Sequence, residues 1–95
     1  MNEALDKKAK SVAANIRKIR EYRNYTQEYL AAKLQISQNA YSRIELGYTR
    51  LTLERFFHIA LILEVDEVEL LKSDENHTVR LHAERSVDDF RSSYR

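Results

Sequence analysis

The chain contains no proline and only one glycine, Gly47, among its 95 residues. Proline and glycine are the residues that most strongly interrupt helices. Residues that favour helices, chiefly alanine, leucine, glutamate, lysine, arginine and glutamine, fill most of the remaining positions. The composition therefore predicts an all-α fold, and a chain of this length forms one domain with at most a short appendage.

Apolar residues at spacings of three and four, separated by residues that cap helices, predict five helices. The first covers about residues 2–23 and ends at Asn24, which tolerates a left-handed backbone. Gly47 ends the third helix in the same way. The four later helices follow favourable N-cap residues: Thr26, Ser37, Thr52 and Asp66. The fourth helix is expected to bury the apolar residues of one inner side: Leu53, Phe56, Phe57, Ala60 and Leu63.

Residues 73–77, with the sequence Ser-Asp-Glu-Asn-His, are interpreted as a polar linker. They separate a domain over residues 1–72 from a C-terminal extension over residues 73–95. The extension carries apolar residues at helical spacing: Val79, Ala83, Val87, Phe90 and Tyr94. Because an isolated helix of this length is marginal in water, the extension must dock on its own domain, dock on a partner or fray.

Charge is unevenly distributed along the chain. Residues 1–50 contain ten basic and five acidic side chains, whereas residues 51–95 contain six basic and ten acidic ones. A basic half beside an acidic half favours a polyanion-binding face on a protein of nearly neutral net charge.

The composition argues against catalysis and metal binding. The absence of cysteine removes disulfides, thiolate metal sites and thiol nucleophiles. His77 and His82 are five positions apart, which does not fit the i, i+4 metal pair of a helix. A single glycine leaves no phosphate-binding or dinucleotide-binding loop. We therefore expect no enzymatic activity, no metal, no cofactor and no small-molecule ligand.

Two further features favour a cytoplasmic protein. The lysines near the N-terminus are not followed by an apolar stretch of signal-peptide length. The longest apolar stretch, residues 56–63, is interrupted by His58 and is too short to span a membrane.

The third expected helix, residues 37–46, has two chemically different faces. At 100° per residue, one face gathers the apolar side chains of Ala40, Tyr41 and Ile44. The opposite face gathers polar side chains that can form hydrogen bonds: Gln38, Asn39, Ser42 and Arg43. Amides pair with adenine and a guanidinium pairs with guanine in the major groove of DNA. The pattern therefore predicts a helix that reads base edges.

Residues 16–71 resemble the phage repressor/Cro-type helix-turn-helix domain, also called the XRE family. The matching segments are Ile16 to Arg20, Thr26 to Ala31, Ile36 to Glu45, Gly47, Ile59-Ala60, Leu63 and Val65. The resemblance covers a little over half of the chain. It implies a five-helix, lambda-repressor-like fold and a transcriptional regulator that binds specific double-stranded DNA.

The resemblance also implies roles for individual residues. Four residues correspond to positions that touch the DNA backbone: Gln27, Tyr48, Thr49 and Arg50. Gln38, Asn39 and Ser42 correspond to base-reading positions, and Arg43 to a contact with base or phosphate. Arg20 and Glu45 resemble a structural ion pair that joins the first helix to the third.

The chain departs from the family pattern at three positions. Gln35 and Glu64 stand where glycine is frequent after the second and fourth helices, so these turns are expected to differ locally. Tyr41 stands where a smaller aliphatic residue is common, and its hydroxyl is expected to reach a phosphate or solvent.

One such domain contacts only a few base pairs, so we expect a homodimer on a pseudo-palindromic site. The expected dimer surface combines Leu61 and Ile62 of the fourth helix with Val87 and Phe90 of the extension. A protein-interaction module, such as an antitoxin or a coactivator, is the alternative, because the same fold also serves such roles.

Overall fold

A computed structural model describes residues 3–72, and these residues form five helices. The helices are α1 (Glu3–Tyr22), α2 (Gln27–Leu34), α3 (Gln38–Glu45), α4 (Leu53–Leu63) and α5 (Glu67–Leu71). The predicted all-α fold is therefore confirmed. The extension with Val87 and Phe90 lies outside the described residues, and the domain boundary after residue 72 stays a prediction.

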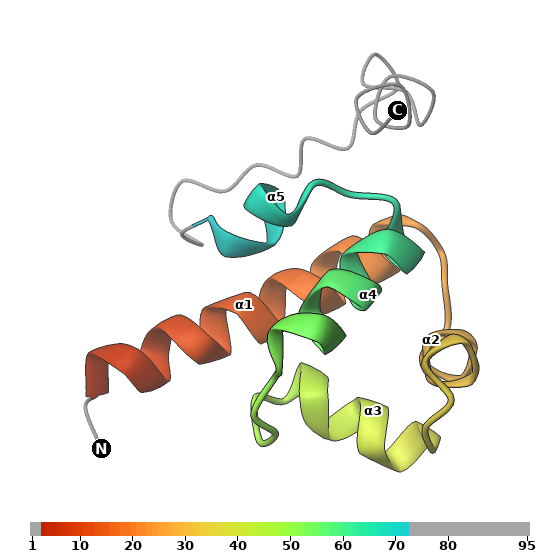
Figure 1. Ribbon diagram of the computed structural model, residues 1–95, viewed down its shortest axis with the longest axis horizontal. Coiled ribbons are helices and arrows are strands. Elements are labelled where there is room, and N and C mark those ends of the chain that lie inside the picture. Colours follow the sequence, from red (N-terminus) through yellow and green to blue (C-terminus); the bar gives the residue numbers. More distant parts are fainter. Residues whose placement is uncertain (1–2, 73–95) are drawn as a thin grey trace.

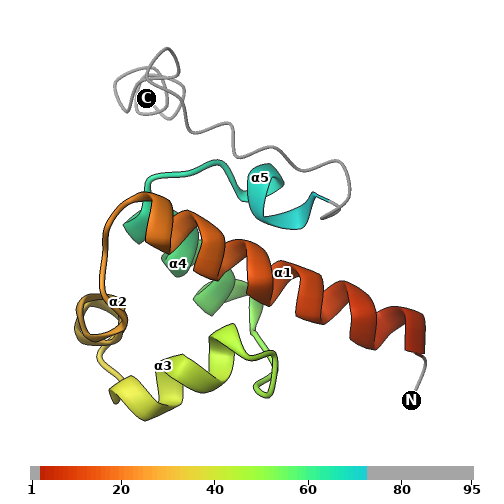
Figure 2. The same cartoon turned by 180° about the vertical axis from the view of Figure 1, so that it is seen from behind.

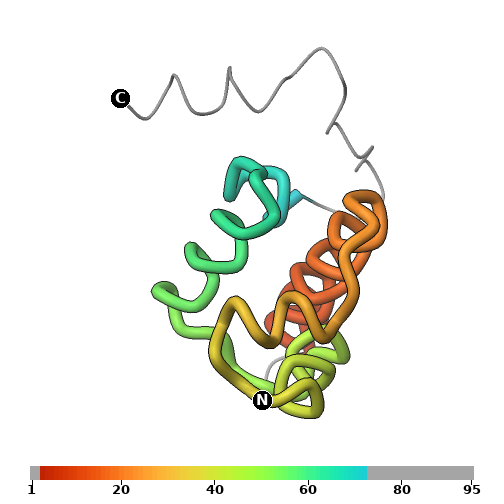
Figure 3. Tube along the Cα trace, turned by 90° about the vertical axis from the view of Figure 1, so that its right-hand side faces the viewer, coloured from red at the N-terminus to blue at the C-terminus, as the bar shows by residue number. Residues whose placement is uncertain are grey.

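The long helix α1 runs across the molecule and contacts most of the other helices (Figure 1). Helix α1 packs against α3, α4 and α5, and α2 packs against α3 and α4. The reverse view shows α1 in front of α4, with α3 at one edge of the molecule and α5 at the opposite edge (Figure 2). Seen from the side, α1 and α4 lie above the α2–α3 pair (Figure 3). This arrangement leaves α3 with one face toward the core and one toward solvent.

The predicted N-caps are confirmed at all four shorter helices. In each case the cap side chain accepts a hydrogen bond from a backbone N–H in the first turn, at 2.9–3.0 Å, with Thr26, Ser37, Thr52 and Asp66 as the acceptors. These bonds satisfy N–H groups that have no partner within the helix. The cap residues thus determine where each helix begins.

The turns at Gln35 and Glu64 do not differ from those that glycine would form. Gln35 has φ 61° and Glu64 has φ 57°, so both residues adopt the left-handed backbone themselves. The backbone N–H of Ile36 donates to Ala31 at 3.0 Å, which closes α2 with the bond pattern of a glycine-terminated helix. The local departure expected at these two turns is therefore wrong. The closing hydrogen bonds and tertiary packing compensate a backbone cost of about 1 kcal/mol.

The core lies where α1, α2, α3 and α4 meet. Its members include Ile16, Ile19, Leu30, Tyr41, Ile59 and Leu63, all fully buried. Two residues expected on the inner side of α4 are not there: Leu53 is 72% exposed and Phe57 is 49% exposed. Helix α4 therefore has a narrower buried stripe than its composition indicates, and apolar side chains remain at its surface.

Two polar side chains, Asn15 of α1 and Arg23 just after its end, hold the C-terminal parts of the domain. The amide of Asn15, which is 0% exposed, donates to the carbonyls of Leu70 and Lys72 at 3.0 and 2.9 Å. The guanidinium of Arg23 donates to the carbonyls of Leu63 and Glu64 at 2.8 and 2.7 Å. Both side chains satisfy carbonyls at the end of a helix, which otherwise lack partners.

We expect Asn15→Ala to destabilise the domain by about 1–3 kcal/mol, because it leaves helix-end carbonyls without their donor. Urea denaturation followed by circular dichroism measures the difference. Ala14→Ser, at the exposed neighbouring position, is the control and should stay within about 0.5 kcal/mol of the parent. An Asn15→Ala variant as stable as this control would show that the two hydrogen bonds contribute nothing net.

Candidate nucleic-acid interface

Helix α3 presents one buried and one exposed face. Tyr41 and Ile44 point into the core, with 0% and 3% of their surface exposed. Gln38, Asn39 and Arg43 are exposed, and Ser42 is partly exposed. The helical periodicity of these residues produces this division. The amide and guanidinium groups of α3 are therefore available to a partner.

The loop that follows α3 extends the exposed polar surface. Tyr48, Thr49 and Arg50 are all exposed. The guanidinium of Arg43 lies 5.8 Å from the centre of the Tyr48 ring, which is within the range of a cation–π interaction. Gly47, with φ 79°, turns the chain here, and an added Cβ would lie 3.0 Å from Cγ of Lys10 on α1. The glycine thus sets the direction in which the loop leaves α3.

Glu45 is the centre of a buried polar network behind the exposed face. The guanidinium of Arg20 donates to both Glu45 oxygens, at 2.6 and 3.2 Å. The hydroxyl of Tyr41 donates to Oε2 at 2.5 Å, and the amide of Gln27 donates to Oε1 at 3.1 Å. The side chains of Arg20 and Glu45 are only 10% and 2% exposed. One carboxylate thus joins residues of α1, α2 and α3.

The network shifts the pKa values of its members in the directions that its geometry requires. Burial alone would raise the pKa of Glu45, but the hydrogen bonds from Arg20, Tyr41 and Gln27 outweigh it and hold that pKa below its ordinary value. The hydrogen bond to Glu45 raises the pKa of Arg20. Burial, followed by the hydrogen bond to Glu45, raises the pKa of Tyr41. Glu45 is therefore ionised and Tyr41 is neutral at pH 7.

A comparison with known families finds a match over residues that include this surface. A family model described as helix-turn-helix matches residues 16–70, which include α2, the turn and α3. No match was found among curated proteins or among solved structures. The chain belongs to the XRE family of helix-turn-helix proteins. The family is one of DNA-binding regulatory domains, not of enzymes.

The structure changes the interpretation of Tyr41 in this helix-turn-helix domain. The expectation that its hydroxyl reaches a phosphate or solvent is wrong, because Tyr41 is fully buried and its hydroxyl donates to Glu45. A buried phenol needs a hydrogen-bond partner. The carboxylate one helical turn later supplies that partner. Tyr41 therefore supports α3 from inside.

Gln27 takes part in the same network, although the family resemblance assigns it to the DNA backbone. Its side chain is partly buried, and its amide donates to Glu45. Gln27 is also the first residue of α2, where backbone N–H groups have no helical partner. Gln27 and Tyr41 are linked because both donate hydrogen bonds to Glu45. Helical periodicity in the sequence does not predict this link.

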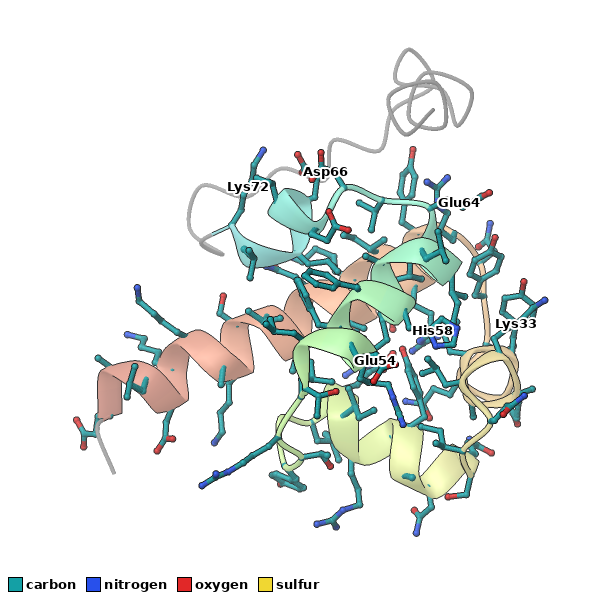
Figure 4. All side chains as sticks on the ribbon, in the orientation of Figure 1. Lys33, Glu54, His58, Glu64, Asp66 and Lys72 are labelled. Atoms are coloured by element: carbon teal, nitrogen blue, oxygen red, sulfur yellow. The ribbon has the colours of Figure 1, made fainter. Side chains whose placement is uncertain are left out.

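The exposed part of α3 and the loop after it carry positive charge, and two acidic side chains of the domain lie far from them. Glu64 and Asp66 lie at the end of the molecule away from α3 (Figure 4). Glu45 is the one carboxylate in α3 and is neutralised by Arg20. The exposed charges of α3 and its following loop are those of Arg43 and Arg50. This end of the domain is therefore suited to a polyanion.

Two other kinds of site are not found in the described part of the chain. Within residues 3–72, none of the helices combines the length and the apolar character needed to cross a membrane. Over the same range, histidines and acidic residues do not gather into a group of three that could hold a metal ion.

The lowered pKa of Glu45 predicts a specific acid sensitivity. A carboxylate whose pKa is lower in the folded than in the unfolded chain stabilises the fold above its ordinary pKa of about 4.3. That contribution disappears as the pH falls through the pKa of the folded state. We expect Glu45→Gln to be less stable than the parent at pH 7, and this difference to shrink below about pH 4. Urea midpoints at pH 7, 5, 4 and 3 measure it, and parallel profiles would contradict it.

Proposed function

We propose that this protein regulates transcription by binding specific double-stranded DNA, with α3 in the major groove. The observation that carries the proposal is the exposed face of α3, where Gln38, Asn39 and Arg43 project from a helix whose other face is fixed in the core. These side chains are the types that form paired hydrogen bonds with adenine and guanine edges. Ser42 adds a hydroxyl at the border of the same face.

Contacts with the DNA backbone are proposed on both sides of α3. On one side, the backbone N–H groups at the start of α2, including that of Gln27, can donate to a phosphate. On the other side, Tyr48, Thr49 and Arg50 are exposed and follow α3 directly. Such contacts position a protein on the duplex without reading its sequence. Arg43, whose guanidinium lies near the Tyr48 ring, is the last of the proposed base-reading residues before this loop.

Selection from random duplexes tests the proposal directly. We expect the full chain to enrich one sequence, and the logarithm of its association constant to fall linearly with the logarithm of salt concentration. Binding that is steeply salt-dependent but enriches no sequence would contradict base reading. Absence of duplex binding at low salt would favour the alternative, a protein-interaction module such as an antitoxin or a coactivator.

We further propose that the regulator is a cytoplasmic homodimer and binds a pseudo-palindromic site. Leu61 of α4 is 67% exposed and Val68 of α5 is 57% exposed, so both can contribute apolar surface to a dimer. Ile62 is partly buried against the core and offers less surface than Leu61. A dimer related by a two-fold axis would place two copies of α3 about one turn of DNA apart.

We expect Leu61→Glu to weaken the dimer, because it places a charge in the proposed apolar contact. Sedimentation should show more monomer than in the parent at equal concentration. Affinity for a paired site should fall, while affinity for a single half-site should be unchanged. Lys33→Glu, on the exposed surface of α2 (Figure 4), is the control for assembly. A parent that is monomeric at high micromolar concentration would contradict the dimer.

A further inference from the structure

An apolar groove of about 710 Å³ lies beside the N-terminal half of α1. One wall is formed by α1 from Leu5 to Ala13, and the other by the loop after α3 and the start of α4. Leu71 of α5 lies at the groove as well. The groove is thus built from four separate parts of the domain.

The walls of this groove contain large apolar side chains that the domain itself does not cover. Leu5 is 58% exposed, Leu53 is 72% exposed, Phe57 is 49% exposed and Leu71 is 59% exposed. Isolated apolar side chains are common at protein surfaces, but several along one groove indicate a contact site. Because the walls are so exposed, the groove suits an elongated occupant with several apolar side chains better than a small molecule, which binds where most of its surface is enclosed.

The chain itself leads from the described domain to one end of this groove. The amide of Asn15 holds the carbonyl of Lys72 against α1 at 2.9 Å. Leu71, the preceding residue, lines the groove together with Ala13 of α1. Residues 73–95 follow directly, so 23 residues of chain begin at the edge of the groove.

We propose that this groove is the docking site for residues 79–94 of the same chain. These residues carry apolar side chains at helical spacing: Val79, Ala83, Val87, Phe90 and Tyr94. In the shortest path they run antiparallel to α1, from the end at Ala13 toward Leu5. Phe90 then lies toward the Leu5 end of the groove, and the apolar surfaces of the segment and the groove cover each other.

The dimensions of the two partners are compatible. The residues between Lys72 and Val79 can span up to about 24 Å when extended, which exceeds the length of the groove wall. From Leu5 to Ala13, α1 rises about 12 Å, whereas a helix from Val79 to Tyr94 would rise about 22 Å, so the wall covers the part of the segment up to about Phe90 and the last turn extends past Leu5. A tether of this length also gives the segment a high effective concentration at the groove, in the millimolar range. Docking within one chain is therefore favoured over docking between copies at low concentration.

Cross-linking in the full chain tests the proposal, because the natural sequence has no cysteine. The variant Asp6→Cys/Arg91→Cys places one thiol at the groove, which Asp6 lines, and one beside Phe90. A short bismaleimide should join them within one chain about tenfold faster than it joins the pair Lys33→Cys/Arg91→Cys. Asp6 and Lys33 are both exposed, so neither substitution removes core packing.

Two added substitutions separate docking from chance collision of a tethered segment. Phe90→Asp should reduce the Asp6→Cys/Arg91→Cys rate to that of the Lys33→Cys control, because it removes an apolar contact. Ser92→Asp, off the apolar stripe, should leave the rate unchanged. Equal rates for the two cysteine pairs, or a rate that Phe90→Asp does not change, would overturn the proposal. A product that joins two chains would also overturn it, and would assign the groove to the segment of a second copy.

Discussion

Replacing Glu45 or Arg20 by alanine is expected to destabilise the domain by about 3–5 kcal/mol, the range for breaking a buried ion pair. Each substitution leaves the other residue of the pair charged and without its partner. That remaining side chain is at most 10% exposed. Glu45→Ala also removes the acceptor of Tyr41 and of Gln27. Urea denaturation followed by circular dichroism measures the free energy of unfolding of each variant.

The double variant and a surface pair complete this experiment. We expect Arg20→Ala/Glu45→Ala to cost less than the two single substitutions added together, because no charge is left unpaired. Arg17→Ala is the matched control. It breaks an ion pair of similar length, 3.1 Å, whose side chains are 60% and 54% exposed, and should cost under about 0.5 kcal/mol. Single substitutions at Arg20 and Glu45 that cost as little as this control would contradict the structural role of the network.

The second large effect is expected on DNA affinity. Gln38→Ala and Arg43→Ala should each cost about 1–3 kcal/mol of binding to the selected site, because each removes a paired contact with a base. The double variant should therefore lose about 2–6 kcal/mol, since the two side chains would contact different base pairs. Titration of labelled duplex by the full chain, at fixed salt, gives the dissociation constants.

Loss of specificity distinguishes base reading from a general electrostatic effect. The Gln38→Ala/Arg43→Ala variant should prefer the selected duplex over unrelated duplexes much less strongly than the parent does. Arg50→Ala should weaken binding to both by the same factor, as expected for a phosphate contact. Arg17→Ala, which also removes one exposed positive charge, controls for net charge. If the double variant still preferred the selected duplex as strongly as the parent, α3 would not be the reading helix.

Most of the helical architecture could be predicted from local sequence. The caps Thr26, Ser37, Thr52 and Asp66 act on backbone groups two or three residues away, so the signal for each helix start is contained in a few neighbouring residues. Periodicity likewise predicts which side chains share a face of α3, because that geometry belongs to a single helix. The order and spacing of these features predicted that the chain belongs to the XRE family, and the match over residues 16–70 confirms this prediction.

The contacts of Asn15 and Arg23 with distant parts of the chain could not be read from the sequence. Asn15 bonds to carbonyls 55 and 57 positions away, and Arg23 to carbonyls 40 and 41 positions away. Neither residue belongs to a sequence motif that predicts such a partner. Only the packing of α1 against α4 and α5 brings these side chains to their carbonyl partners.

The sequence by itself determined where the helices begin and end and which residues α3 can present, because those properties depend on neighbours along the chain. The tertiary structure decided the burial and the hydrogen-bond partners of side chains whose surroundings come from other helices. It turned the Tyr41 hydroxyl inward to Glu45 and left Leu53 and Phe57 at the surface. Helical periodicity gives the direction of a side chain around its own axis. Whether that direction meets solvent or another helix depends on where the other helices lie, which is a property of the folded chain alone.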